Sequence, residues 1–388
     1  MADPDSGPVQ EVGVLIVGAG PYGIALALEL HRLGVPFAVC GEPFKLWLHH
    51  TLPSAALRSD ARTSEVYSHD DRFAMEAILA ERYGTVEARR ICRERIPVSL
   101  YREYLQRVCE RLPFAVQREL IEQLTRTDSG FAARTSRGSV IHSTQVVLAC
   151  GPEPHQRLPR ALASITPDRV IHGWDTERYQ ALSQKRVLVV GSGQSAAEAI
   201  AHLLPHNEVT WVYRTAPIFW ADPIHLPAPI FRLLLHASTC FRWLPSAPRR
   251  WLARLFTGST ITPDLEAAVF STQVDRIECD IDGLALVDVG SEIQSRKLER
   301  SFDRVVACTG YRTSFANLRF LAPELAAATC CQQGFPELDR NYETSARGVF
   351  AIGSLAEPRH GPAQRFVMGS QNAAIAVSRV LARRHEAS

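Results

Sequence analysis

The chain has 388 residues, of which 46% are hydrophobic and 22% charged, so it can bury a large core and is long enough for about two or three domains. Its 43 basic and 41 acidic residues leave a formal charge of +2 without a long run of either sign. This balance disfavours a nucleic acid or an anionic membrane as partner. We therefore expect a globular enzyme that acts on a small molecule.

Targeting segments and metal sites are also disfavoured. The opening stretch MADPDSGPVQEVG is acidic and small, unlike a secretory signal, and no stretch reaches the roughly 18 uninterrupted apolar residues of a membrane span. A cytoplasmic location without stable membrane insertion is expected. The nine cysteines form no C-x-x-C pair, which indicates neither a zinc site nor a redox disulfide. His202 and His206 have helical spacing, but Pro205 should end the helix there, so no metal is expected.

A glycine turn follows the first apolar segment, VGVLIV at residues 12–17, which reads as a buried parallel strand. Gly18, Gly20 and Gly23 have the G-x-G-x-x-G spacing, and an apolar helix follows, with Pro21 suited to its start. In such a turn the first glycine makes the bend, the second leaves room for a pyrophosphate, and the third lets helix and strand approach. The helix N-terminus then directs free N–H groups at the phosphates.

The same design recurs in KRVLVVGSGQSAAEAI, where Gly191 and Gly193 follow a strand at residues 187–190. The strand after the first turn is followed by Glu42, a candidate for holding an adenosine ribose, whereas the strand after the second turn ends in Arg214. A guanidinium can grip a 2′-phosphate in bidentate fashion, so the second site should prefer NADPH. Two sites of opposite ribose preference suggest two cofactors, and FAD with NADPH is the natural pair.

Two later segments resemble each other, STQVVLACGPEP at residues 143–154 and FDRVVACTGYR at residues 302–312. Both read as buried strands that end in a small residue and glycine. They resemble the strands that close each nucleotide domain in flavoproteins with two dinucleotide-binding domains. In the same superfamily, RGVFAIGS at residues 347–354 is similar to the strand that meets the flavin ribityl chain and pyrophosphate. The helix that follows should begin near residues 361–364 and face the flavin pyrimidine.

Within that superfamily the chain resembles the flavin-dependent ornithine and lysine N-monooxygenases over nearly its whole length. The motifs are GSGQSAAE, CTGY preceded by Asp303, and VIHGWD, in which His172 is expected to be structural. LWLHHTLPSAALRSD lies where the family places segments that line the flavin ring. The family's amino-acid-binding residues have no match here, so the substrate stays open.

The resemblance implies an α/β fold in which a Rossmann-like FAD domain contains an inserted Rossmann-like NADPH domain. Residues 1–165 and 301–388 are expected to form the FAD domain and residues 166–300 the NADPH domain. The expected cofactor-binding residues are Gly18, Ala19, Gly20, Pro21, Tyr22, Gly23, Glu42, Trp47, Arg58, Ser59, Gly191, Ser192, Gly193, Gln194, Ser195, Arg214, Gly310, Gly353, Ser354 and Gln364. Arg58, Gln194 and Gln364 are also the candidate catalytic residues.

The predicted function is that of a monooxygenase that uses NADPH and dioxygen to oxygenate a small molecule, with N-hydroxylation favoured. A disulfide reductase would require a paired redox cysteine motif, which the sequence lacks. A reductase that passes electrons to a partner, or a redox-silent nucleotide-binding scaffold, would also carry two such glycine turns. Residues 217–262, rich in Trp, Phe, Leu and Arg, suit an apolar substrate entrance, an interface between two copies of the chain, or packing within the fold.

Overall fold

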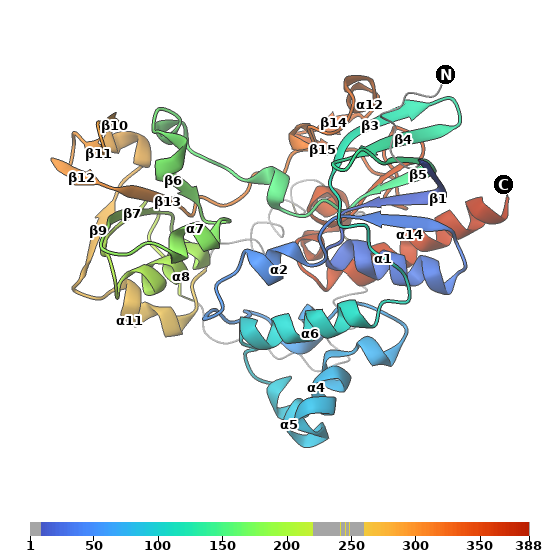
Figure 1. Ribbon diagram of the computed structural model, residues 1–388, viewed down its shortest axis with the longest axis horizontal. Helices are drawn as coiled ribbons and strands as arrows, with labels where there is room; N and C mark the ends of the chain where they lie inside the picture. Colours follow the sequence, from blue (N-terminus) through green and yellow to red (C-terminus); the bar gives the residue numbers. More distant parts are fainter. Residues whose placement is uncertain (1–8, 220–240, 242–244, 246–247, 249–259, 388) are drawn as a thin grey trace.

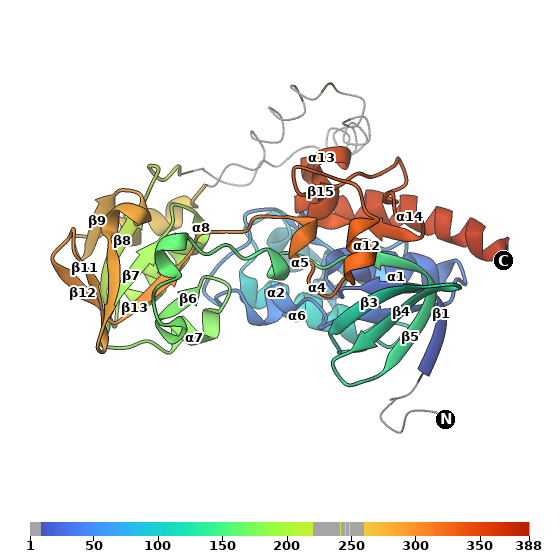
Figure 2. The ribbon, with the colours of Figure 1, turned by 90° about the horizontal axis from the view of Figure 1, so that it is seen from above.

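The chain forms two lobes that lie side by side, with both termini on the same lobe (Figures 1 and 2). The computed structural model describes residues 9–219, 241, 245, 248 and 260–387. Most of the segment 217–262, singled out above as an entrance or interface, lies outside the described residues. Within the described residues, no helix has the length and apolar character needed to cross a membrane.

The first lobe is built on a six-stranded sheet in the order β2-β1-β5-β4-β3, with β16 paired to β5. The strands are β1 (Val9–Val17), β2 (Phe37–Cys40), β3 (Ile121–Thr127), β4 (Gly130–Thr135), β5 (Val140–Leu148) and β16 (Val349–Ala351). The pairings of β1 with β2, of β1 with β5 and of β16 with β5 are parallel. Val14 to Val17 of β1 are buried, as a parallel strand covered on both faces requires. The strands near the glycine turn therefore lie in the centre of this sheet.

Helices from both ends of the chain cover this sheet. α1 (Pro21–Arg32) follows the first glycine turn, and its segment from Gly23 to Leu30 is buried. α14 (Gly369–Glu386) lies beside α1 on the same face (Figure 1). The remaining helices of the lobe are α2 (Lys45–His49), α3 (Ala61–Ser64), α4 (Met75–Tyr83), α5 (Thr85–Ile91), α6 (Val98–Glu110), α12 (Pro323–Ala327) and α13 (Glu357–His360). A short hairpin of β14 (Cys331–Gln332) and β15 (Phe335–Pro336) completes the lobe.

The second lobe contains a five-stranded parallel sheet in the order β6-β13-β7-β8-β9. The strands are β6 (Val170–His172), β7 (Arg186–Val190), β8 (Glu208–Tyr213), β9 (Val274–Glu278) and β13 (Arg304–Ala307). The α-helices among its described residues are α7 (Thr176–Gln180), α8 (Gln194–Leu203) and α11 (Glu266–Val269), and a small antiparallel sheet has the strands β10 (Leu286–Val289), β11 (Glu292–Ser295) and β12 (Arg300–Phe302). Residues of β7 alternate between two clusters: Val187 and Val189 belong to the core shared with α8, and Leu188 and Val190 to the core under the small sheet.

The strand pairings show which segments belong to each lobe. β13 pairs with both β6 and β7, so the second sheet extends to Ala307, beyond the boundary proposed after residue 300. Leu162 and Ile165 already pack in the core of the second lobe, so that lobe also begins a few residues before 166.

Two extended segments connect the lobes and pair with each other. The N–H of Arg157 donates to the carbonyl of Gly310 at 3.1 Å, and the N–H of Arg312 donates to that of His155 at 2.7 Å. Gln156 and Tyr311 form the antiparallel bridge between these bonds. These two linkers, one leading into the second lobe and one leading out of it, thus run side by side.

Candidate functional site

The glycines of the first turn differ in whether the fold requires them. Gly18 has φ +112°, and a Cβ built on it would lie 2.2 Å from the carbonyl oxygen of Ala149. A Cβ on Gly23 would lie 1.9 Å from the carbonyl oxygen of Gly18, so packing excludes any side chain at both positions. Gly20 has an ordinary φ of −76° and a Cβ there would meet no described atom within 4 Å. Neither its backbone conformation nor its described surroundings require glycine, and the free space lies at the N-terminus of α1, where a phosphate would bind.

The second turn repeats this arrangement. Gly191 has φ +136°, and a Cβ on it would lie 2.2 Å from the carbonyl oxygen of Cys308. Gly193 has an extended conformation that other residues can adopt, and α8 starts directly after it. In each lobe the first glycine of the turn therefore packs against the residue after a central strand, Ala149 after β5 and Cys308 after β13. The two segments that resemble each other in sequence occupy equivalent places in the two sheets.

The two ribose candidates follow the strands next to the turns. Glu42 stands two residues after β2, 3.7 Å from the guanidinium of Arg118. Arg214 follows β8 directly, its side chain is 68% exposed, and its guanidinium is 3.9 Å from the carboxylate of Asp280. Both side chains thus stand at the carboxyl end of the strand beside the turn strand, where open parallel sheets bind nucleotides. Their roles toward a ribose stay predictions.

A second group of predicted residues gathers at the end of β16. A Cβ on Gly353 would lie 3.8 Å from the ring of Tyr22, and the Tyr22 hydroxyl donates to the carbonyl of Phe366 at 2.9 Å. Burial raises the pKa of Tyr22 well above its usual value, and the nearby Tyr342 adds to this shift. The hydroxyl therefore stays protonated and holds residues 363–366 over the start of α1.

Gln364 is a buried polar member of this group, at 2% exposure. Its Nε2 donates to the Tyr342 hydroxyl at 3.1 Å, but its Oε1 has no hydrogen-bond partner among the described residues. The buried Oγ of Ser370 is likewise unpaired within the described part of the chain. A buried polar atom left unpaired costs about 1–3 kcal/mol, so this place suits the polar edge of a ligand. Nothing in the local sequence singled out Ser370.

The helix expected to begin at residues 361–364 begins later. Pro362–Arg365 forms only a short 3-10 helix, and α14 starts at Gly369. Phe366 is extended, with φ −113° and ψ 157°, which interrupts the helical path between the two. The free N–H groups in the first turn of α14 therefore come later in the chain than residues 361–364, where the resemblance places the start of this helix.

Three predicted flavin-lining residues point to different partners. The ring of Trp47 packs edge-on against Tyr101 of α6, with 5.1 Å between ring centroids. The hydroxyl of Ser59 lies 2.7 Å from that of Ser64 in α3. Arg58 contacts Thr260 of the second lobe. The described contacts do not bring these side chains together at the first glycine turn.

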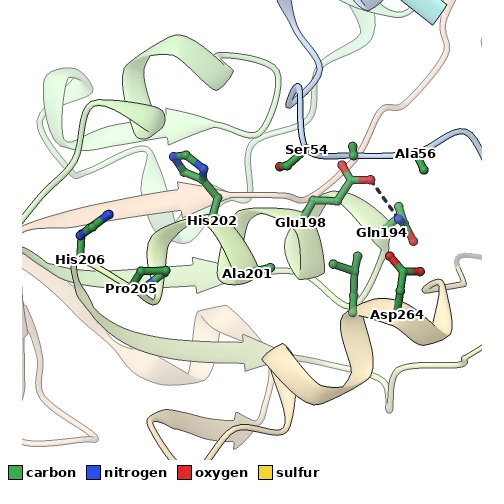
Figure 3. A pocket seen from close by; sticks show the side chains of 11 residues that line it. Ser54, Ala56, Gln194, Glu198, Ala201, His202, Pro205, His206 and Asp264 are labelled. Carbon is green, nitrogen blue, oxygen red and sulfur yellow. Dashed lines mark hydrogen bonds between the residues drawn. The ribbon is translucent and has the colours of Figure 1, made fainter. Parts of the chain in front are cut away.

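Arg58 instead belongs to a group of polar side chains between the lobes, here called the boundary cluster. Its members are Arg58 and Arg95 from the first lobe and Gln194, Glu198, Thr262 and Asp264 from the second. Arg95 forms an ion pair with Asp264, and Gln194 donates to Glu198 at 2.9 Å. Figure 3 shows Gln194 and Glu198 on α8 facing the segment Ser54–Ala56 of the first lobe, with Asp264 beside them. A cavity of about 370 Å³ lies between these elements.

Burial alters the ionisation of this cluster. It raises the pKa of Glu198 to about 7, and the bond from Gln194 together with Arg95 and Arg58 moderates the shift. Burial and the neighbouring Arg95 lower the pKa of Arg58. Burial also opposes ionisation of Asp264, but hydrogen bonds from Arg95 and Thr262 hold its pKa below the usual value. Sequence reasoning missed Arg95 and Asp264, because 169 residues separate them in the chain.

The cysteines near the turns have thiols of low reactivity. Burial raises the pKa of Cys40, Cys150 and Cys308 to about 12, so their thiols stay protonated at neutral pH and are poor nucleophiles. The eight cysteines of the described residues are all free. Among the described residues, no group of three or more His, Cys, Asp or Glu side chains is placed to hold a metal ion.

Comparisons with known proteins agree with the two-lobed architecture. The ornithine N-hydroxylase of Kutzneria sp. 744 superposes with a TM-score of 0.80 at 16% identity, covering 96% of this chain and 99% of that one. The ornithine hydroxylase of Pseudomonas aeruginosa gives 0.76 at 17% identity, covering 97% and 100%. The L-lysine 6-monooxygenase of Pseudomonas syringae gives 0.71 at 20% identity, covering 97% and 99%. These likenesses confirm the predicted fold of two Rossmann-like domains, one inserted in the other.

Sequence comparison gives the family. A curated relative, a probable indole-3-pyruvate monooxygenase (YUCCA9) of Arabidopsis thaliana, is 26% identical over 209 residues, which are 51% of this chain and 46% of the relative. The chain thus matches about half the length of that protein. The family model of the pyridine nucleotide-disulphide oxidoreductases matches residues 15–225, which include both glycine turns and more than half of the chain. The chain belongs to the pyridine nucleotide-disulphide oxidoreductase family.

Proposed function

We propose that this protein is a flavin-dependent monooxygenase that uses FAD, NADPH and dioxygen to oxygenate a small molecule, most readily at an amine nitrogen. The observation that carries the proposal is the pair of equivalent glycine turns, one in each lobe, each opening a helix. The fold shared with ornithine and lysine hydroxylases supports it, as does the partial match to a monooxygenase in sequence.

The residues of the first lobe fit FAD. The open space beside Gly20 suits a pyrophosphate at the N-terminus of α1, and the unpaired Oε1 of Gln364 suits an N–H of the flavin. Residues proposed to hold FAD are Gly18, Ala19, Gly20, Pro21, Tyr22, Gly23, Glu42, Trp47, Arg58, Ser59, Gly353, Ser354 and Gln364. Those proposed for NADPH are Gly191, Ser192, Gly193, Ser195, Arg214 and Gly310, with Gln194 considered separately below.

Bound FAD would accept a hydride from NADPH and activate dioxygen. The chain itself would bind, orient and keep water away from the reacting centre. Gln364 would hydrogen-bond the flavin, and Arg58 would supply positive charge near it. No single acid–base residue is required for this chemistry.

A disulfide reductase is less favoured, because the cysteines that adjoin the glycine turns are buried thiols with raised pKa values. Electron transfer to a partner and nucleotide binding without redox chemistry remain outcomes of the test below. The cytoplasmic location and any self-association through residues 217–262 stay predictions.

The test begins with the absorbance spectrum of the purified protein. Bound FAD should bleach when NADPH is added without oxygen. Isotopically labelled dioxygen is then admitted with panels of amines, sulfides and ketones. A labelled oxygen atom in one product supports the monooxygenase. NADPH consumption that yields only hydrogen peroxide or a reduced acceptor with every panel contradicts it and favours a reductase. If the protein purifies without flavin and does not bind added FAD, the redox-silent nucleotide-binding scaffold is the alternative that remains.

Arg214 provides a prediction on cofactor choice. We expect Arg214→Ser to weaken NADPH binding by about 10- to 100-fold, the value of one or two charge-assisted hydrogen bonds, and to leave NADH binding nearly unchanged. Titration of both nucleotides measures this. Arg300→Ser, which removes another exposed arginine of the second lobe, is the matched control. Equal losses for the two nucleotides would contradict the proposed contact with a 2′-phosphate.

A further inference from the structure

The side-chain amide of Gln194 forms hydrogen bonds within the protein through both its nitrogen and its oxygen. Its Nε2 donates to Oε1 of Glu198 at 2.9 Å and to Oγ1 of Thr262 at 3.1 Å, and its Oε1 accepts from the N–H of Thr262 at 2.9 Å. A side-chain amide has only two N–H donors. Both are therefore used, and Gln194 has none left for a nicotinamide or a substrate.

These bonds fix a segment that reaches the other lobe. Thr262 is 5% exposed, and Gln194 holds both its main chain and its hydroxyl on the first turn of α8. Thr260, two residues before Thr262, contacts Arg58 of the first lobe. Asp264, two residues after it, pairs with Arg95. Gln194 thus anchors the stretch whose two flanking residues carry the contact between lobes.

The first-lobe side of this contact is also held in place. The N–H of Leu57 donates to the carbonyl of Ile96, and the N–H of Val98 donates to that of Ala55, both at 2.8 Å. The two segments run antiparallel and present Arg58 and Arg95 from adjacent positions. The Arg95 side chain is 20% exposed, which limits the freedom of its guanidinium.

A second contact between lobes lies elsewhere. The ring of His50 stacks on that of Trp174, with 4.2 Å between centroids, and the hydroxyl of Thr176 donates to the carbonyl of His49 at 3.1 Å. The two contacts lie on different elements, and together with the paired linkers they restrain rotation of one lobe against the other.

We propose that Gln194 is a positioning residue which, through Thr262, holds Thr260 and Asp264 against Arg58 and Arg95 and so sets the angle between the lobes. The inference rests on the proposed function, because the consequence of that angle is how the second lobe presents NADPH to the flavin. It replaces direct contact with cofactor as the role of Gln194. The ion pair is partly exposed and contributes little energy, so its effect is on geometry rather than on overall stability.

The experiment compares Gln194→Met, Arg95→Met and Asp264→Asn with the unmodified protein. Anaerobic stopped-flow mixing gives the limiting rate of flavin reduction and the dissociation constant of NADPH. Small-angle X-ray scattering of the FAD-free protein reports the arrangement of the lobes without any activity. Arg89→Met is the matched control, since it removes an exposed arginine paired with Glu76 within the first lobe.

We expect each of the three variants to slow flavin reduction about tenfold or more, as small misplacements of reacting groups do, with NADPH affinity unchanged. Their scattering should show a broader set of interatomic distances. Arg95→Asp combined with Asp264→Arg should recover part of the rate, and Arg89→Met should change neither readout. If Gln194→Met does not fold, the Arg95 and Asp264 variants test the same contact.

Three results would overturn the inference: unchanged reduction rates, unchanged scattering in every variant, or a loss of NADPH affinity in Gln194→Met alone, which would make Gln194 a ligand of the nucleotide. Failure of the proposed function has a different signature, because the unmodified protein would then not bind FAD or NADPH would not bleach it. The scattering comparison remains decisive for the contact in that case.

Discussion

Gly18 and Gly20 belong to one turn, but the protein constrains them in different ways. Gly18 is enclosed by the carbonyl of Ala149 and has a positive φ, whereas Gly20 has an ordinary backbone conformation and open space before it. The spacing G-x-G-x-x-G cannot separate these roles, because it records only which positions are glycine. The structure shows that folding explains the first glycine and not the second.

We therefore expect Gly20→Ala to fold with a free energy of unfolding within about 1 kcal/mol of the unmodified apoprotein, since it replaces a helix N-cap glycine without a clash. Its affinity for FAD should fall about 10- to 100-fold, because the new methyl group occupies the space proposed for the pyrophosphate. Thermal denaturation of the apoprotein and titration with FAD measure the two effects.

Gly18→Ala is the comparison, and it should destabilise the apoprotein itself because its Cβ would meet a backbone carbonyl at 2.2 Å. Full FAD affinity in Gly20→Ala would refute the assignment of the pyrophosphate to this turn.

Among the elements, α8 joins the glycine turn to the boundary cluster. Its first residue, Gln194, and Glu198 one turn later face the first lobe, while Ala196, Ala197 and Ile200 are buried against the second sheet. The alternation of apolar and polar positions predicts such a two-sided helix. It does not predict what the polar side meets, and here burial against Ser54–Ala56 shifts the ionisation of Glu198 (Figure 3).

This shift makes stability depend on pH. The pKa of Glu198 is about 7 in the folded protein against an ordinary value of 4.5, so between these values the folded state binds more protons than the unfolded state. The contribution of Glu198 to stability is thus complete below pH 4.5 and is lost as the pH rises through about 7. Glu198→Gln, which keeps the acceptor for Gln194, should be more stable than the unmodified protein at pH 8, by about 1–3 kcal/mol.

The difference between the two proteins should vanish near pH 4.5. Urea unfolding at several pH values measures it, with Glu208→Gln, an exposed glutamate of β8, as control. A difference that does not change with pH would show that Glu198 titrates normally.

At the scale of the molecule, the two lobes are joined by a shared hydrophobic core as well as by their linkers. One continuous cluster of buried apolar side chains includes Val17 and Leu148 of the first sheet together with Val189 and Trp211 of the second. Inter-domain interfaces within a chain are commonly small and permit motion. Continuity of the core couples the folding of one lobe to that of the other.

We therefore expect scanning calorimetry of the apoprotein to show a single thermal transition, with FAD raising the midpoint for the whole chain. Trp174→Ala, which removes the ring stacked on His50, should broaden or split that transition. Two resolved transitions in the unmodified protein would contradict the coupling.

The sequence by itself determined the two turns, their strands and helices, the nested order and the fold. These features are local, since a buried strand, glycines at set spacing and an apolar helix are all read within about thirty residues. Tertiary structure alone decided that α14 begins beyond the flavin-facing residues, and that Gln194 and Arg58 face a boundary with Arg95 and Asp264. The physical reason is that the hydrogen-bond partners and the burial of these side chains depend on residues far away in the chain, and no local pattern records them.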